Sequence, residues 1–237
     1  MTATTSSEPL AGVAVITGAA SGLGAATAVR LRREGIAVAA LDLHPARDVD
    51  LALEVDVRDG EAVERAIDRV EHELGAIRYL MTAAGVYELA PIGGIGVDGW
   101  RRMFAIHIDG TAKACRSVYP RMRERGVGAI VTIGSELALM GDPEAAHYAA
   151  AKGAIHALTK SLAAEAARSG VRVNCVAPGP ADTPLLKPEM RSPEYVRSLV
   201  LQRIVRPDEV AETVAFLMLE PNNFVGAVLS PNAGAVV

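Results

Sequence analysis

The stretch that decides the fold reads GVAVITGAASGLG (residues 12–24). Its first part, GVAVIT (12–17), is a short apolar run rich in β-branched residues, which predicts a buried strand. Its second part, TGAASGLG (17–24), is a glycine-rich turn, and residues 22–34 continue with a helical pattern. A helix that begins behind such a turn presents free N–H groups and a partial positive charge, which suits a pyrophosphate. The spacing G-x-x-x-G-x-G differs from the common G-x-G-x-x-G, and a purely structural turn is the alternative at this point.

Beyond this turn, short apolar runs alternate with helical patterns. Further strands are predicted at 36–42, 52–57, 77–85, 128–135, 171–179 and 226–230, and further helices at 61–74, 97–125, 148–168 and 207–219. This alternation predicts an α/β fold with a parallel sheet covered by helices on both faces.

The chain shows no linker, repeat or low-complexity block. We therefore expect a short disordered tail over residues 1–9 and a single domain over residues 10–237. The segment 183–206 is rich in proline and weakly periodic, and it is interpreted as a flap that covers a ligand.

Composition excludes several classes of function. The net charge is −4 and aromatic residues make up 4% of the chain, so neither a basic footprint nor a stacking surface for nucleic acid is present. Cys115 and Cys175 form no CxxC pair, and we expect no metal site. The polar N-terminus is unlike a secretory signal, and no apolar stretch is long enough for a membrane span. These features predict a cytoplasmic protein.

Asp42 ends the second predicted strand. A carboxylate there accepts hydrogen bonds from ribose hydroxyls and repels a 2′-phosphate, which favours NAD over NADP. The alternative is a helix cap or a loop charge, and Arg47 is a nearby cation that would weaken the preference for NAD.

Three side chains form a candidate catalytic set. Tyr148 and Lys152 are four residues apart on a predicted helix, so both lie on one face. A neighbouring ammonium favours the phenolate, which lets Tyr148 exchange a proton with an alcohol or carbonyl oxygen. Ser135 ends a predicted strand, at the sheet edge where ligands bind, and its hydroxyl can donate to that oxygen. Surface positions for the pair and a turn-forming serine are the structural alternatives.

In combination, these motifs resemble the short-chain dehydrogenase/reductase family from about residue 10 to residue 234. TGAASGLG resembles its TGxxxGxG loop, residues 82–85 its NNAG element, and the stretch from Pro178 to Thr183 its PGxxxT element. The resemblance implies a three-layer, doubly wound Rossmann-type fold with a parallel sheet of about seven strands. It makes Tyr148 the acid/base, Ser135 the residue that orients the substrate oxygen, and Lys152 the residue that binds the nicotinamide ribose. The residues implied to bind the cofactor are Gly18, Ser21, Gly22, Leu23, Gly24, Asp42, Leu43, Asp56, Val57, Ala83, Ala84, Gly85, Tyr148, Lys152, Pro178, Gly179, Ala181 and Thr183.

The sequence departs from the family pattern at several positions. His107 stands where the family has a catalytic asparagine, so it is included in the catalytic set, either as a proton carrier or as a structural histidine. Thr82 replaces an asparagine that braces the sheet, and Ala181 replaces a larger residue at the nicotinamide. Asn232 lies in a C-terminal PNAG that replaces the usual DGG.

We expect an NAD-dependent oxidoreductase that moves a hydride between the nicotinamide and a secondary alcohol or ketone, with a cyclic alcohol or dihydrodiol among the candidate substrates. The alternatives are an NAD-binding regulatory protein with little or no turnover and a different Rossmann enzyme such as a methyltransferase. The expected partners are a small-molecule substrate and further copies of this chain. By resemblance, the helices at about 100–125 and 148–168 form the subunit contacts of a dimer or tetramer. A homotetramer is among the assemblies that we expect.

Overall fold

The computed structural model describes residues 12–236 and builds them around one sheet of seven parallel strands in the order β3-β2-β1-β4-β5-β6-β7. The strands are β1 (Val13–Thr17), β2 (Ala37–Asp42), β3 (Leu51–Glu54), β4 (Ile77–Thr82), β5 (Gly128–Ile133), β6 (Val171–Val176) and β7 (Val228–Leu229). The order reverses between β1 and β4, the kind of switch point at which open α/β sheets bind ligands. The α/β prediction and the predicted single domain with a seven-stranded parallel sheet are confirmed.

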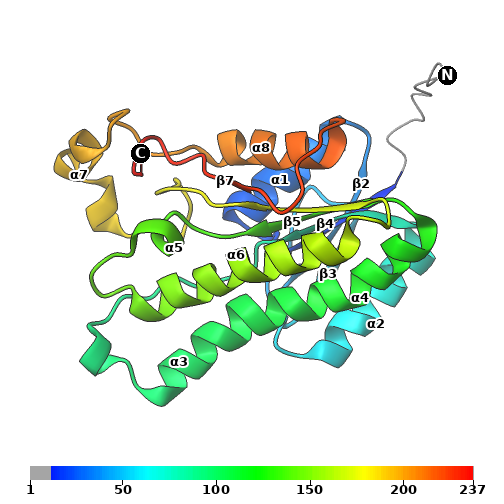
Figure 1. The fold of residues 1–237 in the computed structure, drawn as a ribbon, viewed down its shortest axis with the longest axis horizontal. Helices are drawn as coiled ribbons and strands as arrows, with labels where there is room; N and C mark the ends of the chain where they lie inside the picture. Colours follow the sequence, from blue (N-terminus) through cyan, green and yellow to red (C-terminus); the bar gives the residue numbers. More distant parts are fainter. Residues whose placement is uncertain (1–11, 237) are drawn as a thin grey trace.

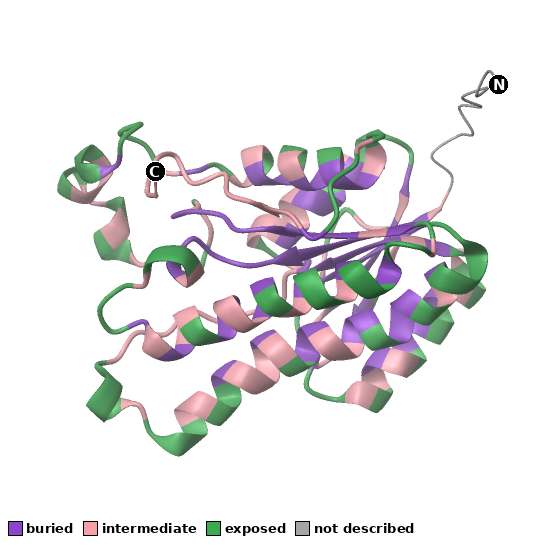
Figure 2. Ribbon diagram, viewed as in Figure 1, coloured by how far each residue is buried: buried purple, intermediate pink, exposed green. Residues whose placement is uncertain are grey.

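Helices cover both faces of the sheet. In Figure 1, α1 (Gly22–Arg33) and α8 (Pro207–Leu219) lie above it, and α2 (Gly60–Glu73), α4 (Gly110–Arg125) and α6 (Ala146–Ala166) lie below it. Each layer has its own apolar core, since Leu31 and Val214 pack above the sheet and Val63 and Val118 below it. The strands between them are buried on both faces (Figure 2), which explains why they read as continuous apolar runs.

Local signals set the helix ends. Asp59 caps α2 by accepting hydrogen bonds from the amides of Glu61 and Ala62. Gly126 ends α4 with a φ of 71°, in the left-handed region. Pro207 opens α8 as its first residue.

The structure corrects the predicted continuous helix over 97–125. That segment consists of α3 (Val97–Phe104), a π-helical turn η2 (Ala105–Asp109) and α4. A π-turn needs only a one-residue change in hydrogen-bond register, which leaves no mark on the apolar pattern. The predicted strands at 52–57, 77–85 and 171–179 also end earlier than expected, because the chain turns into a cleft at these points.

The predicted flap contains short helices. They are η3 (Pro188–Arg191) and α7 (Pro193–Ser198), and two further short elements, η1 (Ile92–Gly94) and α5 (Leu137–Met140), lie elsewhere on the same side of the molecule. A parallel bridge between Ala181 and Val205 closes the base of the flap. The predicted tail over residues 1–9 lies outside the described residues.

Across residues 12–236, no helix combines the length and apolar character needed to cross a membrane. Within the same residues, no group of three or more His, Cys, Asp or Glu side chains is arranged to hold a metal ion.

Candidate active site

The glycine-rich turn packs tightly against the end of β4. A Cβ at Gly18 would come within 2.6 Å of the amide nitrogen of Ala84, and Gly18 itself has a φ of 74°. A Cβ at Gly24 would come within 2.2 Å of the carbonyl oxygen of Gly18. Both positions therefore require glycine. The side chain of Ser21 makes no capping hydrogen bond to α1, which leaves the start of this helix open toward an anion.

Asp42 links the end of β2 to this turn. Its carboxylate accepts hydrogen bonds from the amide of Ala20 at 3.0 Å and from the amide of His44 at 2.9 Å. These bonds hold the carboxylate beside the glycine-rich turn, where its negative charge faces the space in front of α1.

One cleft of about 480 Å³ lies at the carboxyl ends of the strands. Every residue that the sequence analysis placed in the catalytic set or at the cofactor borders this cleft. Its volume is in the range of ordinary small-molecule sites. The topology brings these residues together because the ends of parallel strands meet at one edge of the sheet.

The cleft also contains Arg58, which the sequence analysis did not select. Its guanidinium forms an ion pair with Asp56 at 2.5 Å, and this hydrogen-bonded partner holds the pKa of the Asp56 carboxyl below its usual value. The Asp56 side chain, which the resemblance places at the cofactor, is therefore already paired with Arg58. The spacing of Asp56 and Arg58, two residues apart after the third strand, was the sequence signal that could have indicated this ion pair.

Ser135, Tyr148 and Lys152 all line the cleft. Ser135 and Lys152 are buried, at 5% exposure each, and Tyr148 is partly buried. The Lys152 ammonium donates to the carbonyl oxygen of Ile133 at 2.8 Å and lies 5.7 Å from the centre of the Tyr148 ring. The helical spacing and the strand end therefore bring the three groups to one site.

Burial controls the protonation of this site. It raises the pKa of Tyr148 above its ordinary value, the charge of Glu136 raises it further, and the Ser135 hydroxyl opposes both. Burial also lowers the pKa of Lys152 to about 8. Burial is the largest of the causes acting on Tyr148, because a phenolate is costly to bury.

His107 lies on the π-turn and is buried. Its Nε2 is hydrogen-bonded to the Val86 backbone: depending on the tautomer, it donates to the carbonyl oxygen at 2.9 Å or accepts from the amide at 3.2 Å. Its Nδ1 is buried without a partner, and its ring meets the Tyr148 ring edge-on at 5.5 Å. Burial lowers the pKa of His107 to about 3, so the imidazole is neutral at physiological pH. A Cβ at Gly85 would come within 2.5 Å of this ring, so the glycine makes room for the histidine.

Two residues that sequence reasoning missed stand beside Tyr148. Glu136 is buried at 6% exposure and accepts a hydrogen bond from the Ser135 hydroxyl at 2.9 Å. Tyr87 meets the Tyr148 ring edge-on at 4.8 Å, and its hydroxyl oxygen is buried without a partner. Glu136 is the residue after Ser135, and Tyr87 is two residues after the selected segment 82–85. This closeness in sequence was the signal that could have identified them.

The flap supplies the apolar wall of the cleft through Leu185, Leu186 and Met190. Of the other flap residues, Leu199 is buried and Leu201 is 56% exposed, and neither lines the cleft. Of the predicted flap over residues 183–206, only the first part therefore lines the cleft.

Comparison with known proteins agrees with this geometry. A family model described as enoyl-(acyl carrier protein) reductase matches residues 18–235. The chain belongs to the short-chain dehydrogenase/reductase family. The match covers the glycine-rich turn, the three catalytic candidates and the flap, so the family resemblance found in the sequence is confirmed.

Within the short-chain dehydrogenase/reductase family, a curated relative is the cis-4-hydroxycyclohexanecarboxylate dehydrogenase of Sinomonas cyclohexanicum. It is 40% identical, and the alignment covers 94% of this chain and 95% of the relative. The ligand-free aldohexose dehydrogenase of Thermoplasma acidophilum has a TM-score of 0.88 at 32% identity and covers 95% of this chain and 94% of its own. A 3-ketoacyl-(acyl-carrier-protein) reductase from Brucella melitensis complexed with NADH has a TM-score of 0.89 at 27% identity, with 97% and 99% of the two chains covered.

Proposed function

We propose that this chain is an NAD-dependent oxidoreductase that interconverts a secondary alcohol and its ketone, with a cyclic alcohol as the substrate class. The observation that carries the proposal is that Ser135, Tyr148 and Lys152 share one cleft with the glycine-rich turn. The chemistry named for the Sinomonas relative, a hydroxycyclohexane, supports the substrate class. The apolar flap residues lining the cleft fit a ring with few polar groups.

The residues of the cleft fit a dinucleotide. Gly18 and Gly24 leave a cradle that a Cβ would fill, and the start of α1 opens into it. Asp42 would meet the adenosine ribose, and its charge favours NAD over the 2′-phosphate of NADP. Pro178, Gly179 and Thr183 also border the cleft, and by the family resemblance they would hold the nicotinamide. When bound, the nicotinamide accepts or supplies the hydride.

The side chains of this chain handle the proton and the geometry. Tyr148 exchanges its phenolic proton with the substrate oxygen, and Ser135 donates a hydrogen bond that stabilises charge on that oxygen. Lys152 places a buried ammonium beside the phenol and favours its ionised form. His107 contributes a neutral ring that fixes the chain at Val86, because its low pKa leaves no imidazolium to carry a proton near pH 7.

The test is turnover of a panel of secondary alcohols, cyclic alcohols included, with NAD and with NADP. We expect reduced cofactor from NAD and a loss of at least a hundredfold in kcat for Tyr148→Phe, a typical effect of removing a general acid/base. Tyr119→Phe is the matched control, because Tyr119 is buried on α4 away from the cleft. Tight NAD binding without turnover on any substrate would instead indicate a regulatory protein.

A further inference from the structure

A buried carboxyl group controls the hydrogen bonding of the catalytic serine candidate. The Ser135 hydroxyl donates to Oε2 of Glu136 at 2.9 Å, and its oxygen accepts from the amide of Leu137 at 3.2 Å. Both side chains are more than nine-tenths buried, so water does not compete freely for these bonds. The single hydrogen of the hydroxyl is therefore committed to Glu136.

This arrangement conflicts with the role of Ser135 in the proposed reaction. To stabilise charge on a ketone oxygen, the hydroxyl has to donate its hydrogen to that oxygen. A hydroxyl that donates to a carboxylate has no second hydrogen to give. A protonated carboxyl group can instead donate to the serine oxygen, which frees the serine hydrogen for the substrate.

We propose that Glu136 is a positioning residue that sets the direction of the Ser135 hydroxyl, holding its hydrogen as a carboxylate and releasing it to the substrate oxygen as a carboxylic acid. The inference rests on the proposed function, in which Ser135 serves as the donor. Glu136 lines the same cleft but acts through Ser135.

The surroundings of Glu136 bring this change of protonation close to neutral pH. Burial raises the pKa of Glu136 to about 7, and the charge of Asp142 contributes in the same direction. The titratable groups that face Glu136 come from the loop after α5, the segment after β4, α6 and α7, and they are Asp142, Tyr87, Tyr148, Lys152 and Tyr195.

The neighbouring tyrosines and Lys152 titrate at higher pH than Glu136, so their titrations can be told apart from that of Glu136. The pKa values of the three tyrosines are all raised by burial, so these phenols stay protonated near pH 7. Lys152 titrates with a midpoint at about pH 8, above that of Glu136. Between pH 6 and pH 8, Glu136 is therefore the member of this group expected to change charge most.

The two directions of the reaction respond differently. Ketone reduction needs Ser135 as a donor, so kcat/KM for the ketone should fall as pH rises through about 7, approaching tenfold for each pH unit. Alcohol oxidation needs the Tyr148 phenolate, whose pKa the Glu136 charge raises. Removal of that charge should move the rise in oxidation rate to lower pH.

Glu136→Gln tests both expectations because the amide keeps the shape and a hydrogen-bonding group but cannot titrate. We expect its ketone-reduction profile to lose the fall at about pH 7 and to keep only the later fall around pH 8 from the titration of Lys152, and its oxidation profile to shift to lower pH. Glu144→Gln is the matched control, an exposed glutamate in the loop before α6, and it should keep the wild-type profiles. A Glu136→Gln profile that still falls near pH 7 would overturn the inference.

A second measurement needs no turnover. Infrared difference spectra of wild type against Glu136→Gln should show a carboxyl group that titrates near pH 7. Because the Ser135 hydrogen bond lowers the pKa of Glu136, this titration should move to higher pH in Ser135→Ala. No such carboxyl signal, or one that Ser135→Ala leaves in place, would reject the inference. The substrate panel separately reports failure of the proposed function.

Discussion

Burial makes the charge of Lys152 dependent on pH near the physiological range. Its ammonium is 5% exposed and has one hydrogen bond, to Ile133, and burial lowers its pKa from 10.5 to about 8. The unfolded chain keeps the proton up to its ordinary pKa, whereas the folded chain releases it from about pH 8. The unfolded state therefore binds more protons between these values, and stability rises with pH across this window.

We predict that Lys152→Met removes this pH dependence. Relative to the variant, wild type should gain stability between about pH 8 and pH 10.5, approaching about 3 kcal/mol if the full shift of the pKa applies. Urea unfolding at a series of pH values measures this difference. Lys160→Met, an exposed position on the same helix, is the control and should parallel wild type. Parallel curves for Lys152→Met and wild type would contradict the prediction.

That the candidate residues share one cleft could be predicted from the sequence, but the effect of burial on their pKa values could not. Tyr148 and Lys152 are neighbours because of helical periodicity, which is local and visible in one chain. The degree of burial that raises the pKa of Tyr148 depends on Tyr87, Glu136 and the flap, which reach it from distant parts of the chain. Glu136 escaped notice for the same reason, because a glutamate after a strand is usually solvated.

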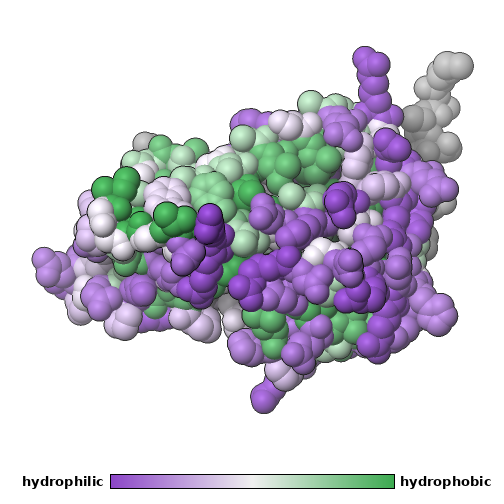
Figure 3. Space-filling model, turned by 90° about the horizontal axis from the view of Figure 1, so that it is seen from below, coloured by the Kyte–Doolittle hydropathy of each residue, from purple (hydrophilic) through white to green (hydrophobic). Residues whose placement is uncertain are grey.

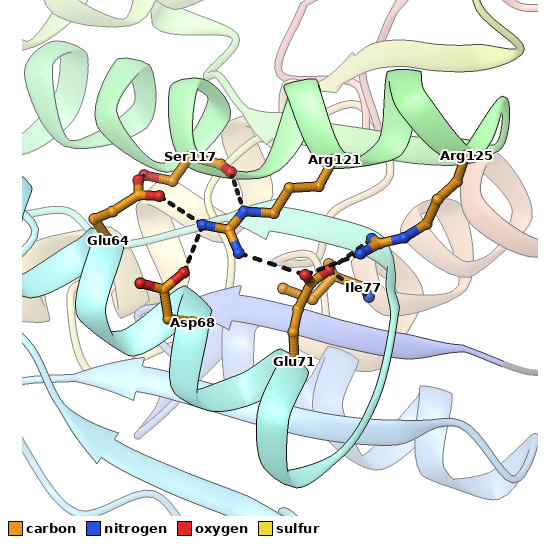
Figure 4. A network of polar contacts seen from close by, with 7 residues as sticks. All are labelled: Glu64, Asp68, Glu71, Ile77, Ser117, Arg121 and Arg125. Carbon is orange, nitrogen blue, oxygen red and sulfur yellow. Dashed lines mark hydrogen bonds and ion pairs between the residues drawn. The ribbon is translucent and has the colours of Figure 1, made fainter.

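At the scale of elements, a polar network joins α2 to α4 (Figure 4). Arg121 on α4 donates to Glu64 at 2.5 Å and to Asp68 at 2.7 Å, and it also pairs with Glu71 at 3.4 Å. Its side chain is only 23% exposed, and Arg125 shares Glu71 at 2.6 Å. A network with one half-buried arginine at its centre holds two helices in register better than isolated surface pairs do.

We predict that Arg121→Met lowers the free energy of unfolding by about 1–2 kcal/mol, because it leaves three carboxylates close together without their shared cation. Arg65→Met is the matched control on α2, where the arginine is 67% exposed and pairs only weakly with Glu61, and little change is expected. Urea unfolding at low and high salt is the measurement, and the Arg121 effect should shrink at high salt. Equal effects of the two variants would argue that the network adds no stability.

The elements themselves were predictable where they depend on local pattern. The strand–turn–helix at residues 12–24 and the alternating order that follows were predicted correctly, because the central strands are buried on both faces and form continuous apolar runs. The π-turn at Ala105–Asp109 was not, because it changes only the hydrogen-bond register. Its His107 packs against Gly85 and is hydrogen-bonded to Val86, contacts with a distant part of the chain that local pattern does not reveal.

At the scale of the whole molecule, polarity is unevenly distributed over the face seen in Figure 3. The face seen from below carries hydrophilic residues at its right-hand end, and hydrophobic residues gather mainly in its upper left and upper middle (Figure 3). On this side of the sheet, α6 carries a row of exposed or half-buried small residues at helical spacing: Ala150, Gly153, Ala154, Ala157, Ser161 and Ala164. Small side chains let another helix approach closely, which agrees with the expected subunit contact through the helix at 148–168.

We predict that Ala157→Arg breaks this contact. Ala157 is exposed in the single chain, so arginine costs the isolated fold little, and its helix propensity is close to that of alanine. In an assembly that packs α6 against a second copy, the same arginine would be buried without a partner on each copy. Native mass spectrometry should therefore show wild type as a dimer or tetramer and Ala157→Arg as a smaller species with an unchanged circular dichroism spectrum. Val29→Arg on α1, across the sheet, carries the same new charge and should keep the wild-type mass; an Ala157→Arg variant that also keeps it would place the subunit contact elsewhere on the molecule.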